Sequence, residues 1–129
     1  YVKKVAIYRG TSNLVNEEAT ASGWGAVSDN SGLSNVLRHV TNNIISNEEC
    51  KMFYLDLRVI DSTVCLSGSG DKTPCSGDSG APLHIVENNK LFQAGIGSFG
   101  RGTTCGGGFP SGYSRVSSFA KWIDDNKKP

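Results

Sequence analysis

The sequence lacks the features that mark a membrane protein, a nucleic-acid-binding protein or a metal site. No apolar run approaches the roughly 18 residues that a membrane-spanning helix needs. With 13 basic and 12 acidic residues the net charge is +1, so there is no electrostatic case for binding nucleic acid or a membrane surface. No two of the four cysteines form a C-x-x-C pair, which argues against zinc. We therefore expect no nucleic acid, no membrane, no metal and no cofactor.

Methionine is scarce and glycine is abundant, with 1 and 16 residues respectively. Many glycines indicate many turns, which favours an all-β chain over a helical bundle. The 129 residues are enough for one domain with a real core. The first ten residues, YVKKVAIYRG, lack the anatomy of a signal peptide. If the protein is secreted, its signal therefore lay on something upstream.

The four cysteines are Cys50, Cys65, Cys75 and Cys105. An even number in a glycine-rich, β-like chain favours two disulfides and an oxidising compartment. Three pairings are open from the sequence alone. Pairing of neighbours would close two moderate loops, each worth about 3–4 kcal/mol in the chain-entropy view.

Several segments carry signals for local structure. Residues 19–27 (ATASGWGAV) predict a strand with glycine bends, and residues 25–35 predict a polar loop. Residues 83–99 predict a hairpin that turns at Asn88-Asn89, because asparagine tolerates positive φ.

Two short helices are predicted. The first covers residues 46–54, where Ser46 and Glu49 form an S-x-x-E capping box. The second lies in the C-terminal tail, with Ser117 as its cap. The apolar residues on one face of this second helix are Val116, Phe119, Ala120 and Ile123.

One segment can be interpreted in two ways. Its apolar residues have helical spacing, at Leu33, Val36, Leu37, Val40 and Ile44. Its β-branched residues and asparagines favour strands and turns instead. The pattern alone does not decide between helix and strand.

The stretch TPCSGDSGAPL, residues 73–83, carries the chemistry. A nucleophilic serine needs a tight turn where backbone N–H groups converge on a developing oxyanion. Gly77 permits such a backbone, and Ser79 would supply both the attacking oxygen and a second N–H donor. A harmless Asp-Ser-Gly turn is the alternative interpretation of these four residues taken alone.

Further motifs occur in one order along the chain. They are Ser22-Gly23-Trp24-Gly25, Cys50, Cys65, CSGDSGAPL, GIGSFG at 95–100, Cys105 and GYSRVSSFAKWI at 112–123. Over essentially its whole length, the sequence resembles the C-terminal half of a chymotrypsin-family serine protease, of the insect and crustacean kind. The resemblance implies an all-β fold: a six-stranded antiparallel Greek-key barrel with a short intermediate helix and a C-terminal helix. It also implies that residues 34–45 are mostly strand.

The resemblance assigns roles to individual residues. Ser79 would be the nucleophile, and the N–H groups of Gly77 and Ser79 would form the oxyanion hole. Asp78 would receive the N-terminal ammonium that zymogen cleavage frees. Ser98 to Gly100 would pair with extended substrate, and the disulfides would be Cys50–Cys65 and Cys75–Cys105. The substrate-binding residues would be Thr73, Ser76, Gly97, Ser98, Phe99, Gly100 and Ser111.

The resemblance also bears on specificity. Family members that cut after Lys or Arg carry an aspartate where this chain has Thr73. Ser111 on the facing wall is neutral too, and a buried cation without a partner is costly. Open walls at Gly97 and Gly100 suit large apolar or aromatic side chains. Asp71 is interpreted as a solvated loop charge, with a broader specificity as the alternative if it is re-aimed.

The base for Ser79 is missing from the sequence. The histidine and aspartate motifs of the family belong to its first barrel, and neither motif occurs here. His39 and His84 are interpreted as ordinary packed or surface histidines. The leading hypothesis is a secreted serine endopeptidase whose histidine and aspartate come from a companion N-terminal chain, bound noncovalently. Peptide or protein substrates, and protein inhibitors, are its other expected partners. The alternative is an inactive pseudoprotease or binding module.

Overall fold

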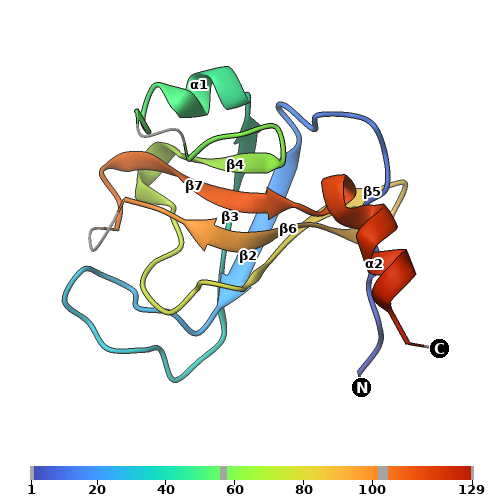
Figure 1. Ribbon diagram of the computed structural model, residues 1–129. Coiled ribbons are helices and arrows are strands. Elements are labelled where there is room, and N and C mark those ends of the chain that lie inside the picture. Colours follow the sequence, from blue (N-terminus) through green and yellow to red (C-terminus); the bar gives the residue numbers. More distant parts are fainter. Residues whose placement is uncertain (1, 56–57, 102–104, 129) are drawn as a thin grey trace.

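Six antiparallel strands close into a barrel (Figure 1) in the computed structural model, which describes residues 2–55, 58–101 and 105–128. The barrel order is β5-β2-β3-β4-β7-β6, and β6 returns to β5. The strands are β2 (Glu18–Gly23), β3 (Arg38–Ile45), β4 (Thr63–Gly68), β5 (Pro82–Glu87), β6 (Lys90–Phe99) and β7 (Gly108–Arg115). The predicted barrel is confirmed, and so is the hairpin, with Asn88 and Asn89 both at positive φ.

A short N-terminal strand joins the barrel from outside. β1 (Ala6–Ile7) pairs with β6 in parallel, and the Tyr8 N–H continues this ladder by donating to the Gln93 carbonyl at 2.8 Å. Arg9 then forms a two-pronged ion pair with Asp124, at 2.7 and 2.8 Å. The N-terminal segment is thereby tied to the C-terminal helix.

The first helix is shorter than predicted. α1 (Asn47–Lys51) begins after Ser46, whose hydroxyl accepts from the Glu49 N–H at 3.1 Å. The predicted cap is therefore confirmed, but the helix ends at Lys51 rather than at residue 54.

The C-terminal helix begins differently from the prediction. The chain leaves β7 directly into the 3-10 helix η2 (Val116–Phe119), followed by α2 (Ala120–Asn126). The prediction of Ser117 as cap is wrong, because Ser117 lies inside η2 and Phe119 precedes α2 without a side-chain cap. No helix in the described ranges is long and apolar enough to cross a membrane.

The ambiguous segment forms a strand, as the resemblance implies. Val40 and Ile44 lie on β3, and a separation of four residues also fits the two-residue period of a strand. Leu33, Val36 and Leu37 precede the strand and are exposed. The helical spacing was therefore a coincidence of one strand and one loop.

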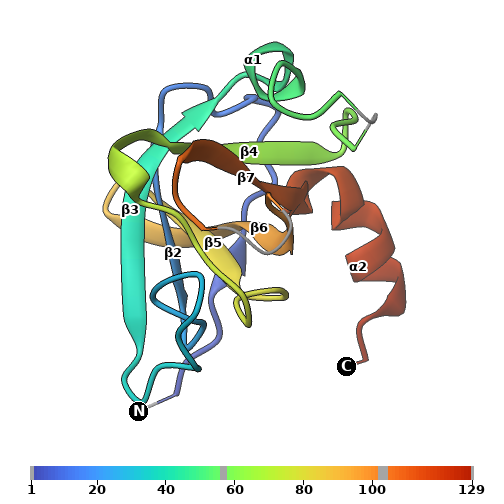
Figure 2. The ribbon, with the colours of Figure 1, turned by 90° about the vertical axis from the view of Figure 1, so that its left-hand side faces the viewer.

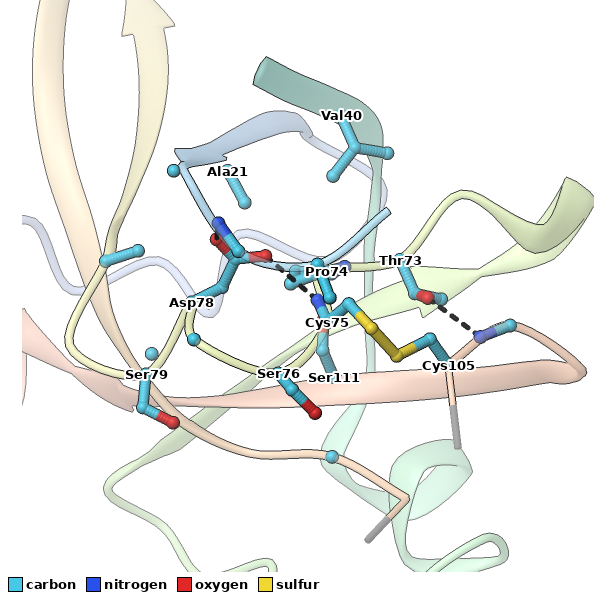
Figure 3. A pocket seen from close by; sticks show the side chains of 18 of the residues that line it. Ala21, Val40, Thr73, Pro74, Cys75, Ser76, Asp78, Ser79, Cys105 and Ser111 are labelled. Atoms are coloured by element: carbon cyan, nitrogen blue, oxygen red, sulfur yellow. Dashed lines mark hydrogen bonds between the residues drawn. A yellow bond between two sulfur atoms is a disulfide. The ribbon is translucent and has the colours of Figure 1, made fainter. Parts of the chain in front are cut away.

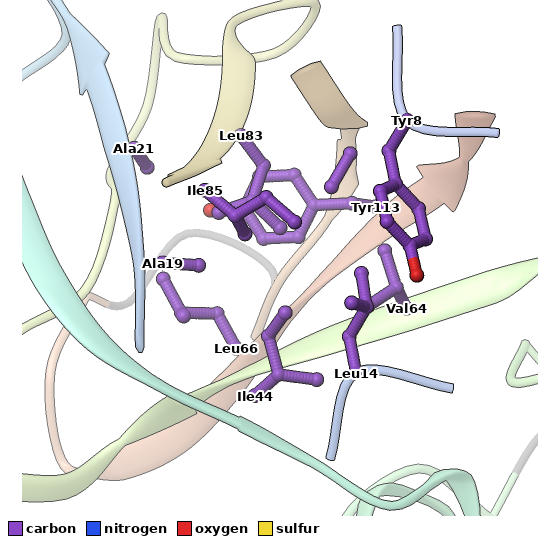
Figure 4. Close-up of a cluster of buried hydrophobic side chains, with 11 residues drawn as sticks. Tyr8, Leu14, Ala19, Ala21, Ile44, Val64, Leu66, Leu83, Ile85 and Tyr113 are labelled. Atoms are coloured by element: carbon purple, nitrogen blue, oxygen red, sulfur yellow. The ribbon is translucent and has the colours of Figure 1, made fainter. Parts of the chain in front are cut away.

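The core fills the barrel interior (Figure 4). Every second residue of β2 points inward, so Ala19 and Ala21 are buried while Thr20 is not. Leu66, Leu83 and Ile44 are fully buried. A smaller cluster surrounds the Cys50–Cys65 disulfide and includes Tyr54 and Val59. Helix α1, which carries Cys50, lies beside β4, which carries Cys65 (Figure 2).

Candidate active site

Ser79 lies on a tight turn between the 3-10 helix η1 (Ser69–Asp71) and β5. The Asp78 N–H donates to the Cys75 carbonyl at 3.0 Å, and the Gly80 N–H donates to the Gly97 carbonyl of β6 at 2.9 Å. Gly77 and Gly80 have φ of +93° and +83°, a region that L side chains rarely enter. The two glycines therefore allow the turn that presents Ser79 to solvent.

The N–H groups of Gly77 and Ser79 have no hydrogen-bond acceptor among the described residues. Both neighbouring donors are already used, the Asp78 N–H by the Cys75 carbonyl and the Gly80 N–H by the Gly97 carbonyl of β6. Free, fixed donors beside an exposed hydroxyl are what an oxyanion hole requires.

The Asp78 carboxylate lies in a small backbone pocket, called the Asp78 seat below, which is formed by Gly23, Gly25 and Cys75. It accepts from the Gly25 N–H at 2.8 Å and from the Cys75 N–H at 2.9 Å. A Cβ on Gly23 or Gly25 would lie 2.2 or 2.3 Å from this carboxyl group, so the seat fits only glycine at both positions. Figure 3 shows the Asp78 and Ser79 side chains leaving the turn in different directions. Within the described ranges Asp78 has no cationic partner, and its pairing with an ammonium remains a prediction.

A cleft of about 790 Å³ opens beside the turn. Its lining includes Gly77, Asp78 and Ser79. It also includes each predicted substrate-binding residue: Thr73, Ser76, Gly97, Ser98, Phe99, Gly100 and Ser111. The structure thus brings together segments that are up to 38 positions apart in the sequence, from Thr73 to Ser111.

Hydroxyl groups gather in the lining of the cleft (Figure 3). Thr73 accepts from the Gly106 N–H at 3.1 Å, and buried Ser111 donates to the Tyr113 hydroxyl at 3.2 Å. Burial raises the pKa of Tyr113 to about 12, so this phenol is neutral at physiological pH. Thr73, Ser111 and Tyr113 therefore contribute polar groups without charge.

Two carboxylates hold the outer wall of the cleft. Asp71 accepts from the Gly107 N–H at 2.8 Å, and Asp29 accepts from the Cys105 N–H. The Cys75–Cys105 disulfide also joins the segment of Asp71 to the segment of Gly107. Asp71 is exposed but it is more than a solvated loop charge, since it anchors the facing wall. The role of Asp29 was not predicted, because nothing in the sequence relates it to a residue 76 positions away.

The predicted substrate-pairing edge, Ser98 to Gly100, is backed by aromatic rings. The Phe99 and Tyr54 rings meet edge to face with centroids 5.1 Å apart, and the Tyr54 hydroxyl donates to the Pro110 carbonyl. A Cβ on Gly112 would lie 2.3 Å from the Phe99 ring, so glycine is needed where β7 passes it. The sequence signalled Phe99 but not its support by Tyr54.

The two histidines lie on strands of the barrel. His84 lies on β5 opposite Thr20, and His39 lies on β3 opposite Ser22. Neither forms a hydrogen bond with Ser79 in the part of the chain that is described. Burial, helped by the nearby His39, lowers the pKa of His84, which favours its neutral form. No three described His, Cys, Asp or Glu residues could hold a metal ion together.

Both disulfides have the pairing that the resemblance implied, Cys50–Cys65 and Cys75–Cys105. The neighbouring strands β2 and β5 carry no cysteine. Ala19 and Ile85 are 1% and 4% exposed and belong to the apolar core. Packing therefore joins these strands without a covalent link.

Comparison with known proteins agrees with this geometry. A family model described as "Trypsin" matches residues 1–123. "Serine protease 1" of Drosophila melanogaster is 39% identical over 108 residues, which are 84% of this chain and 39% of that protein. "Brachyurin" of Leptuca pugilator is 40% identical over 110 residues, 84% of this chain and 46% of that protein.

A solved structure shares the fold. The structure of HL collagenase superimposes with a TM-score of 0.85 at 34% identity, covering 97% of this chain and 54% of its own. The chain spans less than half the length of the two relatives above.

Proposed function

Because the chain belongs to the trypsin family of serine proteases, we propose that it carries the nucleophile of a serine endopeptidase. The observation that supports this most is an exposed Ser79 on a glycine turn, beside two unused N–H donors and a cleft. Ser79 Oγ attacks the scissile carbonyl carbon, and the N–H groups of Gly77 and Ser79 stabilise the oxyanion. The amine leaves with a proton, and water then hydrolyses the acyl-enzyme.

The base comes from a companion chain that holds the first barrel, while residues 1–129 form the second. A serine hydroxyl without a base is a weak nucleophile, and the described residues provide none. The companion's histidine takes the Ser79 proton and passes it to the leaving amine, and its aspartate orients that histidine. Cleavage of one precursor would yield both halves and free an ammonium for the Asp78 seat.

The surface of the chain supports a companion. Its accessible area is 8427 Å², whereas a compact monomer of 13.7 kDa exposes about 6,600 Å². Pro82 and Ile96 face each other across β5 and β6 and are both exposed, close in sequence to Ser79 and Ser98. Phe119 and Trp122 are exposed on the segments that follow β7. All cysteines are paired within the chain, so the association would be noncovalent.

The proposed substrates are peptides and proteins cut after large apolar or aromatic residues. Thr73, Ser111 and Tyr113 offer no negative charge for lysine or arginine, and a desolvated cation would be costly. Two disulfides fit secretion into an oxidising, extracellular setting, where protein inhibitors would compete for the same cleft.

A serine-directed phosphonylating probe tests this proposal. We expect Ser79 to be labelled in the complex of the two halves and not after the substitution Ser79→Ala. The isolated chain should label far more slowly, since it lacks the base. Absence of label on Ser79 in the complex would reject the proposal and favour the alternative, an inactive binding module of the same fold.

A further inference from the structure

A row of five side chains crosses the outer face of the barrel. Residues that pair across neighbouring strands point to the same face of a sheet, so the strand register defines the row. Its members are Ile7 of β1, Gln93 of β6, His84 of β5, Thr20 of β2 and Thr41 of β3. His84 is the one titratable member, and it points outward because its neighbours Leu83 and Ile85 belong to the core.

Exposed apolar residues lie on both sides of His84 along the β5–β6 ladder. Pro82 pairs with Ile96 on the side of the nucleophile turn, and Val86 pairs with Leu91 on the side of the hairpin. All four are exposed, although alternation places them on the outer face of a closed barrel. His84 itself is half-buried and forms no hydrogen bond with another described residue. An apolar patch with a polar group at its centre is typical of a surface that a partner covers.

Charged groups lie at the margins of this face. Glu18 and His39 share it, two positions before the row on β2 and β3, and Glu87 pairs with Lys90 at the end of the β5–β6 hairpin. Burial and the nearby His39 lower the pKa of His84, and no carboxylate of the described residues offsets this shift. His84 is therefore neutral at pH 7, and a partner that covered it as a cation would bury an unpaired charge, which is costly.

The companion chain proposed above is the occupant that fits this face. The accessible area of the chain exceeds that of a compact monomer by about 1,800 Å², more than the roughly 800 Å² that one partner buries in a standard interface. The match to HL collagenase covers 97% of this chain and 54% of that one. The face also begins at Pro82, three positions after Ser79, so it is continuous with the proposed site.

We infer that the companion docks on the outer face of β2, β5 and β6 and contacts His84 as a neutral imidazole, so that acid weakens the assembly of the active site. The inference rests on the proposed function, because its occupant is the companion of that proposal. A protonated His84 must release its proton for the complex to form. The dissociation constant of the halves should therefore rise as the pH falls, by up to about tenfold per pH unit for one linked proton.

Binding of a fluorophore-labelled companion half, followed by anisotropy, isolates this proton. The dissociation constant is measured at about pH 7.5 and at about pH 5, on either side of the ordinary histidine pKa. We expect the ratio of the two constants to be about tenfold larger in wild type than in His84→Gln, which cannot take up the proton. Titrating groups on the companion contribute equally to both ratios. His39→Gln is the matched control and should keep most of the pH dependence.

A second variant tests the face without a change of pH. Leu91→Glu should raise the dissociation constant at neutral pH at least about tenfold, because it places an unpaired charge in the interface. Met52→Glu, at the exposed end of α1, is its control and should leave binding unchanged.

Equal pH ratios in wild type and His84→Gln, or tight binding by Leu91→Glu, would overturn the inference. If the phosphonylating probe still labels Ser79 in that complex, the proposed function stands. A complex that shows the predicted pH dependence but leaves Ser79 unlabelled would support the docking face and reject only the proposed catalysis.

Discussion

The two disulfides join regions that are built in different ways. Cys50 and Cys65 are 0% exposed and packed among apolar side chains under α1. Cys75 and Cys105 are partly exposed in a wall held by polar contacts to backbone, from Asp29, Asp71 and Thr73. The first region contributes mainly to stability, because its apolar side chains are buried from water. The second contributes mainly to the shape of the cleft, because its polar contacts hold the wall open. We expect substitutions in the two regions to separate stability from activity.

The largest separation is expected for Ser79→Ala in the complex. Loss of the nucleophile should lower kcat by about a millionfold. The free energy of unfolding should stay within about 0.5 kcal/mol, because Ser79 is exposed. Steady-state kinetics and denaturant unfolding measure both quantities, with Ser118→Ala, exposed in η2, as the control. If the Ser79→Ala complex kept a kcat close to that of wild type, another group would have to be the nucleophile.

Removal of each disulfide tests the comparison directly. In chain-entropy terms the pocket disulfide, which closes 30 residues, should be worth slightly more than the core disulfide, which closes 15. Packing predicts the reverse order, because Cys50→Ala with Cys65→Ala also leaves a buried cavity. We expect the core pair to cost about 3–5 kcal/mol of unfolding free energy and to leave the kinetics of folded protein intact.

The pocket pair, Cys75→Ala with Cys105→Ala, should cost less stability and more of kcat/KM. Calorimetry and peptide hydrolysis on the same samples decide between the two orders. Equal activity losses in both double variants would show that the two regions are not separable.

Gly25→Ala tests whether the Asp78 seat supports the oxyanion turn. The new Cβ would lie 2.3 Å from the Asp78 carboxyl carbon, so Asp78 must move. Displacement of the turn should lower kcat about 100- to 1000-fold, the loss seen when one oxyanion donor is removed. Gly32→Ala is the matched control, since a Cβ there meets nothing within 4 Å. A higher KM with an unchanged kcat would argue against a role of the Asp78 contacts in shaping the oxyanion turn.

The smallest effect concerns alkaline pH and Tyr113. Its folded-state pKa of about 12 lies above its ordinary value of 10.0, chiefly because of burial. The resulting stability is present below pH 10 and is lost as the pH rises toward 12. Between pH 9 and 11 we expect wild type to lose about 1 kcal/mol more unfolding free energy than Tyr113→Phe. Identical pH slopes in the two proteins would exclude Tyr113 as the source.

Local and motif-based features could be predicted from the sequence. The glycine turn around Ser79, the Asn88-Asn89 hairpin and the Ser46 cap each depend on residues within a few positions. The prediction that Ser117 caps the C-terminal helix was wrong, because β7 continues directly into the 3-10 helix η2 and Ser117 lies inside it. Helical spacing from Leu33 to Ile44 misled because it combined exposed loop residues with one face of a strand.

Contacts between distant segments could not be predicted. Asp29 with Cys105, Asp71 with Gly107 and Leu33 with Gly77 bring together loops that carry no mutual signal in the sequence. These loops follow β2, β4 and β6 or precede β5, and only the folded barrel brings them together. The least predictable contacts are therefore those that shape the walls of the proposed site.

Titration of the chain with its companion half tests the central claim most directly. With a chromogenic ester, the amplitude of the acylation burst counts competent Ser79 groups. We predict no burst from the chain alone, then an amplitude that rises linearly to one equivalent of companion and remains constant. A burst from the isolated chain, or none at equimolar companion, would contradict an active site divided between two chains.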